Sequence, residues 1–309
     1  MKASLVIPIF NNESNLEDLL FMLIKQKEVF EKEGHTLEPI LVVDGSPDNC
    51  LELLLNAKSK SLTPKNTRII ELSKNYGQVS AILAGLEVST GDCSICYSAD
   101  LQDPPELMLK LFRNFLDKKE IVIAVRSSRE DTFFQNTTSK IAYWLLRIKS
   151  PEIPKGGFDF FLLGNNAKRF ILERAGSRRF LQGDILNLGF SPEFIKYRRL
   201  KRKNGKSAYN FRTRFNVFID ALFDSTDLFI KLATRLGFII AFLGIISAIF
   251  VLIEYLKGYS PYDGFTAIFS SILILGGLQL MMLGIIGEYV YRTYDIARNR
   301  PRYIIKNIF

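Results

Sequence analysis

The sequence contains very little histidine and cysteine. His35 is the only histidine among 309 residues, which excludes histidine-dependent hydrolase triads and zinc sites with several histidine ligands. Cys50, Cys93 and Cys96 are odd in number, and a disulfide framework is not expected from them. Cys93 and Cys96 lie three residues apart in a strand-like segment, so their side chains point to opposite faces and cannot share a metal ion. We therefore expect these thiols to be packing residues.

Charged residues are absent from two long stretches, residues 236–253 and 264–287. Each stretch is close to the roughly 20 residues that a helix needs to cross a bilayer. We expect two transmembrane helices at about 234–256 and 264–290, although a pair of buried core helices would have a similar composition. Basic residues flank this hairpin, and no secretory signal is present at the N-terminus. The predicted location is therefore the inner membrane, multi-pass, with the catalytic domain and both termini cytoplasmic.

The net charge of +9 is concentrated in one segment. Residues 196–214 hold nine Lys or Arg residues and no acid. Few aromatic residues are interleaved with these charges, so we expect no nucleic-acid partner and favour anionic lipid headgroups or a lipid phosphate. A Phe-rich amphipathic stretch follows at residues 211–232. It either packs against the domain or lies at a membrane interface.

Strand and helix patterns alternate through the N-terminal part of the chain. Strands are predicted at residues 3–9, 39–43, 67–72, 94–97 and 121–125, with helices starting at about 48, 78 and 105. Ser14 and Glu17 have the spacing of a capping box for a further helix. Repeated units of this kind predict an α/β domain with a mainly parallel sheet covered on both faces. The expected division is a domain at 1–210, interfacial helices at 211–232, and the hairpin with a tail at 233–309.

An acidic cluster follows the fourth predicted strand directly, in the segment Asp100-Leu-Gln102-Asp103-Pro-Pro. Ligands of open α/β sheets bind at the carboxyl ends of parallel strands. Mg²⁺ is usually held by one or two carboxylates together with substrate phosphates. The segment therefore predicts a site for a metal-bound sugar nucleotide.

Several motifs together resemble family 2 glycosyltransferases of the GT-A fold. They are Val6-Ile-Pro8-Ile-Phe10-Asn-Asn-Glu13, Val43-Asp44-Gly-Ser-Pro-Asp48, Asn75-Tyr-Gly77-Gln78 and the acidic cluster. The end of the second uncharged stretch and the tail Arg300-Pro-Arg-Tyr303 are similar to the polyprenyl-phosphate glycosyltransferases, which include dolichol-phosphate mannose synthase and bacterial undecaprenyl-phosphate glucosyltransferases. Each motif alone is weak evidence for the family, but their order and spacing together are strong evidence. The resemblance covers nearly the whole chain.

The resemblance implies an inverting, metal-dependent transfer of a sugar from a nucleotide diphosphate sugar to polyprenyl phosphate. A UDP-sugar is the favoured donor, and undecaprenyl phosphate is the expected acceptor. Asp100 and Gln102 are the implied ligands of Mg²⁺ or Mn²⁺. The implied nucleotide-binding residues are Pro8, Phe10, Glu13, Asp44, Gly77, Gln78 and Asp100. Two carboxylates that the family usually carries are missing, because Ser98 and Val43 stand in their places.

The same resemblance implies an acceptor-phosphate site rich in arginine, a side chain that binds phosphate bidentately. Its residues are Arg126, Arg129, Arg199, Arg202 and Ser207, and the implied catalytic residues are Asp100, Asp159 and Arg202. A phosphomonoester is already anionic at neutral pH. We therefore expect Asp159 to orient groups or balance the arginines rather than to act as a base.

Two other functions stay open. One is a glycosyltransferase that acts on another lipid-linked acceptor. The other is a non-catalytic, membrane-anchored scaffold that binds a sugar nucleotide or lipid and partners a flippase. The resemblance also implies a homo-oligomer such as a tetramer and a downstream flippase as partner, and Gly284 and Gly287 would permit close helix approach.

Overall fold

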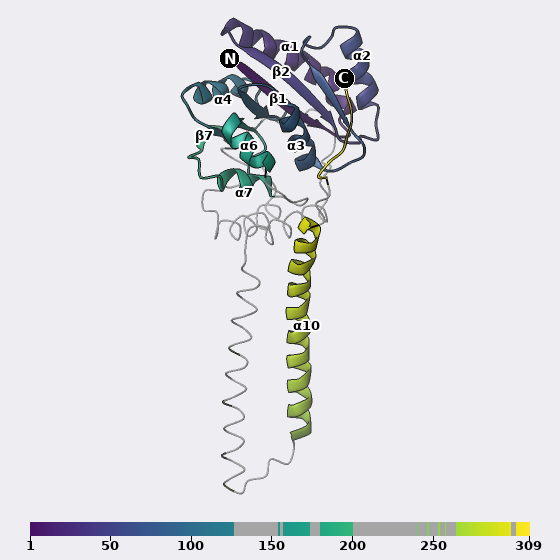
Figure 1. Cartoon of the computed structure of the whole chain (residues 1–309), viewed down its shortest axis with the longest axis vertical. Coiled ribbons are helices and arrows are strands. Elements are labelled where there is room, and N and C mark those ends of the chain that lie inside the picture. Colours follow the sequence, from purple (N-terminus) through teal and green to yellow (C-terminus); the bar gives the residue numbers. More distant parts are fainter. Residues whose placement is uncertain are drawn as a thin grey trace. The chain divides into compact units, whose positions relative to one another are not determined.

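The computed structural model describes residues 1–126, 154, 157–173, 180–199, 239, 246, 253, 257, 264–297 and 301–309. Contacts divide the chain into two units, Met1–Ser225 with Pro301–Phe309, and Thr226–Arg300. Most described residues of the second unit form helix α10 (Gly264–Ala297; Figure 1). The predicted segment 211–232 lies outside the described residues. The boundaries expected at 210 and 232 stay predictions.

The first unit is built on one sheet with helices between its strands (Figure 1). Its strands are β1 (Lys2–Ile9), β2 (Thr36–Val43), β3 (Arg68–Leu72), β4 (Cys93–Cys96), β5 (Ile121–Arg126), β6 (Phe161–Gly164), β7 (Glu193–Tyr197) and β8 (Ile305–Ile308). Its helices are η1 (Glu13–Asn15), α1 (Leu16–Lys32), α2 (Cys50–Ser59), α3 (Gln78–Val88), α4 (Leu107–Leu116), α6 (Asn165–Glu173) and α7 (Leu181–Leu186). The predicted alternation of strands and helices is confirmed. The predicted capping box is wrong, because Asn15 is the N-cap of α1 and makes no side-chain cap bond.

The strand order is β7-β5-β6-β4-β1-β2-β3-β8. Strands β3, β2, β1 and β4 pair in parallel. Strand β6 is antiparallel to both β4 and β5, and β7 is parallel to β5. It follows that β1 to β5 and β7 all run in one direction, with their carboxyl ends at the same edge of the sheet. The α/β class is confirmed, but the sheet is mixed because β6 and β8 run the opposite way.

Helices cover both faces of the sheet. Alternate residues of β1 point to opposite sides. Leu5 and Ile7 are fully buried in a core that includes apolar residues of α1 and α4. Val6 faces α3, where a Cβ atom added to Gly85 would lie 2.3 Å from a Val6 methyl group. The absence of a side chain at Gly85 therefore lets α3 pack closely on the sheet.

The C-terminal residues close one edge of this sheet. Strand β8 pairs antiparallel with β3, and the amide of Ser73 donates to the carbonyl of Ile304 at 3.0 Å. Glu71 of β3 accepts from Lys306 Nζ at 2.6 Å and from Asn307 Nδ2 at 2.7 Å. The tail that the sequence analysis grouped with the hairpin thus packs with the sheet, and it covers the edge strand β3, which would otherwise present unpaired backbone groups.

The prediction of a membrane-spanning hairpin is not supported, and the predicted multi-pass location in the inner membrane is wrong. Among the residues that the structure describes, no helix combines the length and the apolar character needed to cross a bilayer. Helix α10 covers the second predicted span. Most of the first predicted span lies outside the described residues.

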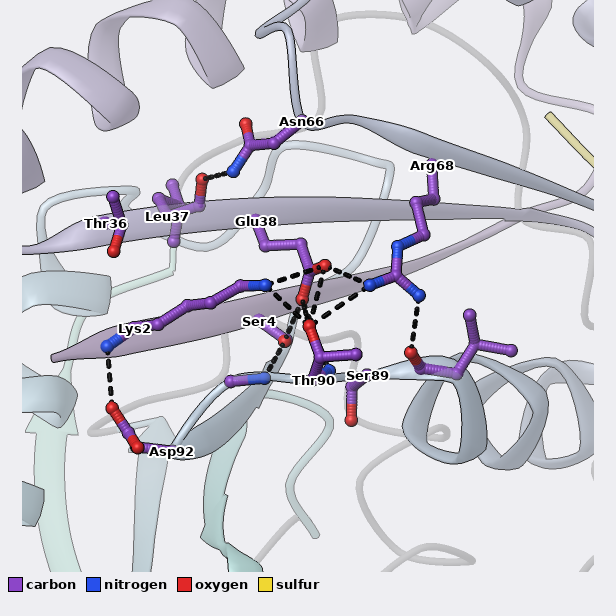
Figure 2. A network of polar contacts seen from close by, with 12 residues as sticks. Lys2, Ser4, Thr36, Leu37, Glu38, Asn66, Arg68, Ser89, Thr90 and Asp92 are labelled. Atoms are coloured by element: carbon purple, nitrogen blue, oxygen red, sulfur yellow. Dashed lines mark hydrogen bonds and ion pairs between the residues drawn. The ribbon is translucent and has the colours of Figure 1, made fainter.

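A buried carboxylate joins residues at the amino ends of four strands (Figure 2). The predicted site lies at the carboxyl ends of these strands. Glu38 of β2 is 2% exposed and accepts from Ser4 Oγ of β1 at 2.6 Å. Arg68 Nη2, at the start of β3, lies 2.5 Å from Glu38 Oε1, and Lys2 Nζ lies 3.0 Å from the same oxygen. Thr90, just before β4, donates its hydroxyl to Glu38 at 3.0 Å. These contacts fix the relative positions of strands that are far apart in the sequence.

The charge of Glu38 contributes to stability. Burial would raise the pKa of Glu38, but hydrogen bonds from Ser4, Lys2 and Thr90 outweigh burial and lower the pKa from 4.5 to about 2. Because the pKa is lower in the folded state, the stabilisation is present above the unfolded value and is lost as the pH falls toward the folded value. At about 1.4 kcal/mol per pKa unit, the contribution is on the order of 3 kcal/mol.

We predict that Glu38→Gln lowers the free energy of unfolding by about 2–3 kcal/mol at pH 7, and by less than half of that near pH 3. Urea unfolding at both pH values measures the difference. Glu28→Gln, at an exposed position of α1, is the control and should change stability by less than about 0.5 kcal/mol. An equal loss at both pH values for Glu38→Gln would mean that the charge is not what stabilises the fold.

Candidate active site

The predicted site residues follow strands that end at one edge of the sheet. Pro8 lies near the end of β1, Asp44 follows β2, Asp100 follows β4, and Arg126 ends β5. Since these strands run in one direction, their carboxyl ends form the edge where open α/β sheets bind ligands. Tyr197, the last residue of β7, reaches the same edge.

Asp44 organises the loop between β3 and α3. Its carboxylate accepts hydrogen bonds from the backbone amides of Tyr76 at 2.7 Å and Gly77 at 2.8 Å. It is 2% exposed, and burial raises its pKa although these two amides partly offset the effect. Gly77 is the N-cap of α3 with φ +90°, and Gln78 is the first residue of that helix. Asp44 was predicted to bind a nucleotide; in the structure its two carboxylate oxygens hold the loop that carries Gly77 and Gln78.

Gly45 allows the same loop to approach β2. Its φ is +55°, and a Cβ atom there would lie 2.3 Å from the backbone nitrogen of Asn75. A side chain would collide with backbone that cannot move aside easily. The Asp44-Gly45 pair therefore sets the spacing between the two loops.

The loop after β1 is also tied to the loop after β2. The amide of Asn11 donates to Ser46 Oγ at 2.7 Å, and the amide of Glu13 donates to Asp48 Oδ2 at 3.1 Å. In return, the amide of Asn49 donates to Glu13 Oε2 at 3.2 Å. Glu13 thus joins the two loops, which places Pro8 and Phe10 beside the loop of Asp44.

We predict that Asp44→Asn loosens the loop that Asp44 holds. An asparagine side chain accepts with one atom only, so one of the two backbone amides loses its carboxylate acceptor, at a cost of about 1–3 kcal/mol in unfolding free energy. Hydrogen exchange followed by NMR should show faster exchange at Tyr76 or Gly77. Asp117→Asn, at an exposed position after α4, is the control. Unchanged exchange at both amides would contradict this role of Asp44.

The carboxylates after β4 are bound to a guanidinium group. Arg199 Nη2 lies 3.2 Å from Asp100 Oδ2, and Arg199 Nε lies 3.5 Å from Asp103 Oδ1. Asp103 is fully buried, whereas Asp100 is 11% exposed. The amide of Gln102 donates to Asp100 Oδ1 at 3.2 Å, which places both residues on the same turn.

A second arginine lies close to this group. Tyr197 donates its hydroxyl to Asp103 Oδ1 at 2.5 Å, and Arg126 Nε donates to the Tyr197 hydroxyl oxygen at 3.4 Å. Arg126 Nη2 donates to Asp159 Oδ2 at 2.9 Å. Asp100, Arg126, Asp159 and Arg199, which the sequence predicted as site residues, are therefore linked in one network through Asp103 and Tyr197.

The electrostatics of the network keep Arg126 charged. Burial lowers the pKa of Arg126, but Asp159 together with Tyr197 and Asp103 outweighs that effect, so the pKa is raised. Burial raises the pKa of Asp103, and the Tyr197 hydrogen bond and both arginines offset only part of it. Burial and the neighbouring Asp103 raise the pKa of Tyr197. At neutral pH the edge therefore presents a positive guanidinium beside a neutral phenol.

A divalent cation fits this edge on chemical grounds. Among the described residues no group of three or more His, Cys, Asp or Glu side chains forms a metal site. However, the Asp100 carboxylate already pairs with the Arg199 guanidinium, so the turn after β4 accepts positive charge. A hard cation held by one carboxylate and an amide oxygen would complete its coordination with substrate phosphates and water. Asp100 and Gln102 could supply such oxygens.

Several predicted residues cannot be placed. Arg129, Arg202 and Ser207 lie outside the described residues. Conversely, Asp103 and Tyr197 were not among the predicted catalytic, nucleotide-binding, metal or acceptor-phosphate residues. Asp103 was visible in the acidic motif, but the contact with Tyr197 depends on the pairing of β5 with β7, which no local pattern predicts.

Comparison with known proteins decides the family. Residues 4–167 match the sequence model of a protein family described as glycosyl transferase family 2. The chain belongs to this family. It is accordingly a glycosyltransferase, and the family resemblance found in the sequence is confirmed.

Relatives of this glycosyltransferase cover its full length. It is 32% identical over 311 residues to an uncharacterized glycosyltransferase of Synechocystis sp., covering 100% of this chain and 96% of the relative. It is 30% identical over 311 residues to the bactoprenol glucosyl transferase of Shigella phage SfV, covering 99% of each chain. It is 31% identical over 304 residues to the putative glycosyltransferase CsbB of Bacillus subtilis, covering 98% and 91%.

Solved structures share the fold. Glucosyl-3-phosphoglycerate synthase from Mycobacterium tuberculosis, in complex with UDP, matches with a TM-score of 0.51 and 15% identity over 72% of this chain and 79% of that chain. The same enzyme with Mn²⁺, UDP-glucose and phosphoglyceric acid matches with a TM-score of 0.50 and 14% identity over 72% and 78%. At such identities the similarity shows the fold alone, and it confirms an α/β GT-A-like arrangement.

Proposed function

We propose that this glycosyltransferase transfers a sugar from a UDP-sugar to polyprenyl phosphate, with inversion at the anomeric carbon and with Mg²⁺ or Mn²⁺ as cofactor. The observation that carries the proposal is the network in which two arginines, Arg126 and Arg199, lie beside Asp100 at the carboxyl edge of the sheet. Guanidinium groups bind phosphate oxygens, and a carboxylate at this edge suits a metal-bound diphosphate. Both substrates of the proposed reaction carry phosphate.

The relatives support the identity of the two substrates. The relative from Shigella phage SfV is named for transfer of glucose to bactoprenol, a polyprenyl lipid, and it aligns with this chain from end to end. The structural relative from Mycobacterium tuberculosis binds Mn²⁺ and UDP-glucose. We therefore favour UDP-glucose among the donors to be tested and undecaprenyl phosphate as the acceptor.

We assign the nucleotide sugar and the acceptor phosphate to two different sides of the edge. The loops held by Asp44 and Glu13, which carry Phe10, Gly77 and Gln78, would receive the nucleotide. A metal ion at Asp100 and Gln102 would supply positive charge to stabilise the departing diphosphate. Arg126 and Arg199 would hold the acceptor phosphate in line with the anomeric carbon. The positions proposed for Arg129, Arg202 and Ser207 extend this acceptor side.

We predict that Asp100→Asn lowers kcat/KM for sugar transfer by at least about 100-fold, because the change removes charge at the point where the diphosphate leaves. Purified protein, undecaprenyl phosphate, Mn²⁺ and radiolabelled UDP-glucose, UDP-N-acetylglucosamine and GDP-mannose form the assay. The product is a labelled lipid monophosphate sugar.

The control for this change is Asp92→Asn, which alters a carboxylate just before β4 rather than just after it. It should leave turnover close to that of the unchanged protein. Full turnover by Asp100→Asn would reject the role of Asp100, and failure of the unchanged protein to label the lipid with any donor would reject the proposed reaction.

We predict a smaller effect for Asp159→Asn. Asp159 pairs with Arg126, and the acceptor oxygen is already anionic near neutral pH, so no base is required. The expected loss in kcat/KM is about tenfold, with the acidic limb of the pH–rate profile unchanged. A loss beyond about 1,000-fold together with disappearance of that limb would instead identify Asp159 as a general base.

A further inference from the structure

Asp103 occupies the junction between the two arginines of the site. Its carboxylate oxygen Oδ1 lies 2.5 Å from the Tyr197 hydroxyl and 3.5 Å from Arg199 Nε. The Tyr197 hydroxyl in turn accepts from Arg126 Nε at 3.4 Å. One buried oxygen atom therefore lies next to Arg199 directly and next to Arg126 through a single hydroxyl group.

Asp103 is too deeply buried to contact a substrate itself. Its side chain is fully inaccessible, and among the described residues no hydrogen-bond donor contacts its second oxygen, Oδ2. A buried carboxylate is costly unless it is paired, and an unsatisfied oxygen adds to that cost. Replacement by an apolar residue would avoid the cost, so a contribution to function is the more economical explanation for this carboxylate.

The backbone around Asp103 is held in place. Leu101 has a positive φ of 55°, and Pro104 follows Asp103 directly. Proline restricts both its own backbone and that of the residue before it. Asp103 is therefore a fixed point, and the long arginine side chains are the parts whose positions depend on it.

The position of the Tyr197 side chain is also fixed by its contacts. Arg126 and Tyr197 are register partners on the parallel strands β5 and β7. The Tyr197 ring packs against Phe160 with centroids 6.5 Å apart, and Phe160 packs against Tyr97 at 5.2 Å. The hydroxyl group of Tyr197 thus lies at a defined place between Asp103 and Arg126.

We propose that Asp103 and Tyr197 form a positioning pair that holds Arg126 and Arg199 in the arrangement that binds the acceptor phosphate. The inference rests on the proposed function, because it assigns these two residues to the acceptor side of the same site. Neither residue contacts the reacting atoms. The pair acts by limiting the orientations that two flexible guanidinium groups can adopt, so that less conformational entropy is lost when phosphate binds.

The test compares Asp103→Asn and Tyr197→Phe with the unchanged protein. Asp103→Asn keeps the shape and removes the charge, and Tyr197→Phe keeps the ring and removes the hydroxyl. Each should raise KM for undecaprenyl phosphate by about tenfold, the value expected for loss of one charge-assisted hydrogen bond. The dissociation constant of UDP with Mn²⁺, measured by calorimetry, should change less than about twofold, since the donor side keeps its contacts.

A double-mutant cycle distinguishes a pair from two independent residues. If Asp103 and Tyr197 act together, the double variant should raise KM for the acceptor little more than Asp103→Asn alone. Tyr97→Phe is the matched control, because it removes a buried hydroxyl bond of the same loop and leaves the Asp103 carboxylate in place. It should lower the melting temperature without raising KM for the acceptor. If Asp103→Asn does not fold, the KM of Tyr197→Phe for undecaprenyl phosphate tests the proposal alone.

The outcomes separate the two proposals. Product formation by the unchanged protein together with an unchanged acceptor KM in Asp103→Asn and Tyr197→Phe would overturn the positioning pair and leave the proposed function intact. An equal rise of KM in Tyr97→Phe would also overturn it, because general loosening of the loop would then explain the effect. Absence of lipid product from the unchanged protein would overturn the proposed function and the positioning pair with it.

Discussion

The common direction of strands β1 to β5 and β7 is the constraint on which the candidate site depends. Loops far apart in the sequence meet because each follows a strand that ends at the same edge. The buried charge of Glu38 helps to maintain this alignment at the opposite ends of the strands. The network of carboxylates and guanidinium groups at the functional edge therefore relies on a second polar network at the other end.

The two networks differ in how they use buried charge. Glu38 accepts from donors at the ends of three neighbouring strands and has a lowered pKa, as expected for a carboxylate that stabilises a fold. The Asp103 carboxylate accepts fewer hydrogen bonds and has a raised pKa. Its oxygen Oδ2 has no hydrogen-bond partner among the described residues. Incomplete satisfaction of this kind is more typical of functional sites than of purely structural ones.

Much of the fold was predictable from local patterns. The five strands from residues 3–9 to 121–125 and the helices between them followed from β-branched runs and helical periodicity, and β1 to β5 confirm them. The antiparallel insertion of β6 and the pairing of β8 with β3 were not predicted, because such pairings join segments distant in the sequence. The membrane hairpin was predicted from missing charge, and the described residues contain no helix apolar and long enough to support it.

Residue types and their spacing along the chain were enough to predict the α/β alternation, the acidic turn after β4 and the family. Two features became visible only in the fold: Asp44 holds a loop through two backbone amides, and Asp103 and Tyr197 connect the two arginines. Hydrogen bonds between residues 33 or 94 positions apart have no local signature. They arise only when parallel strands bring their carboxyl ends together.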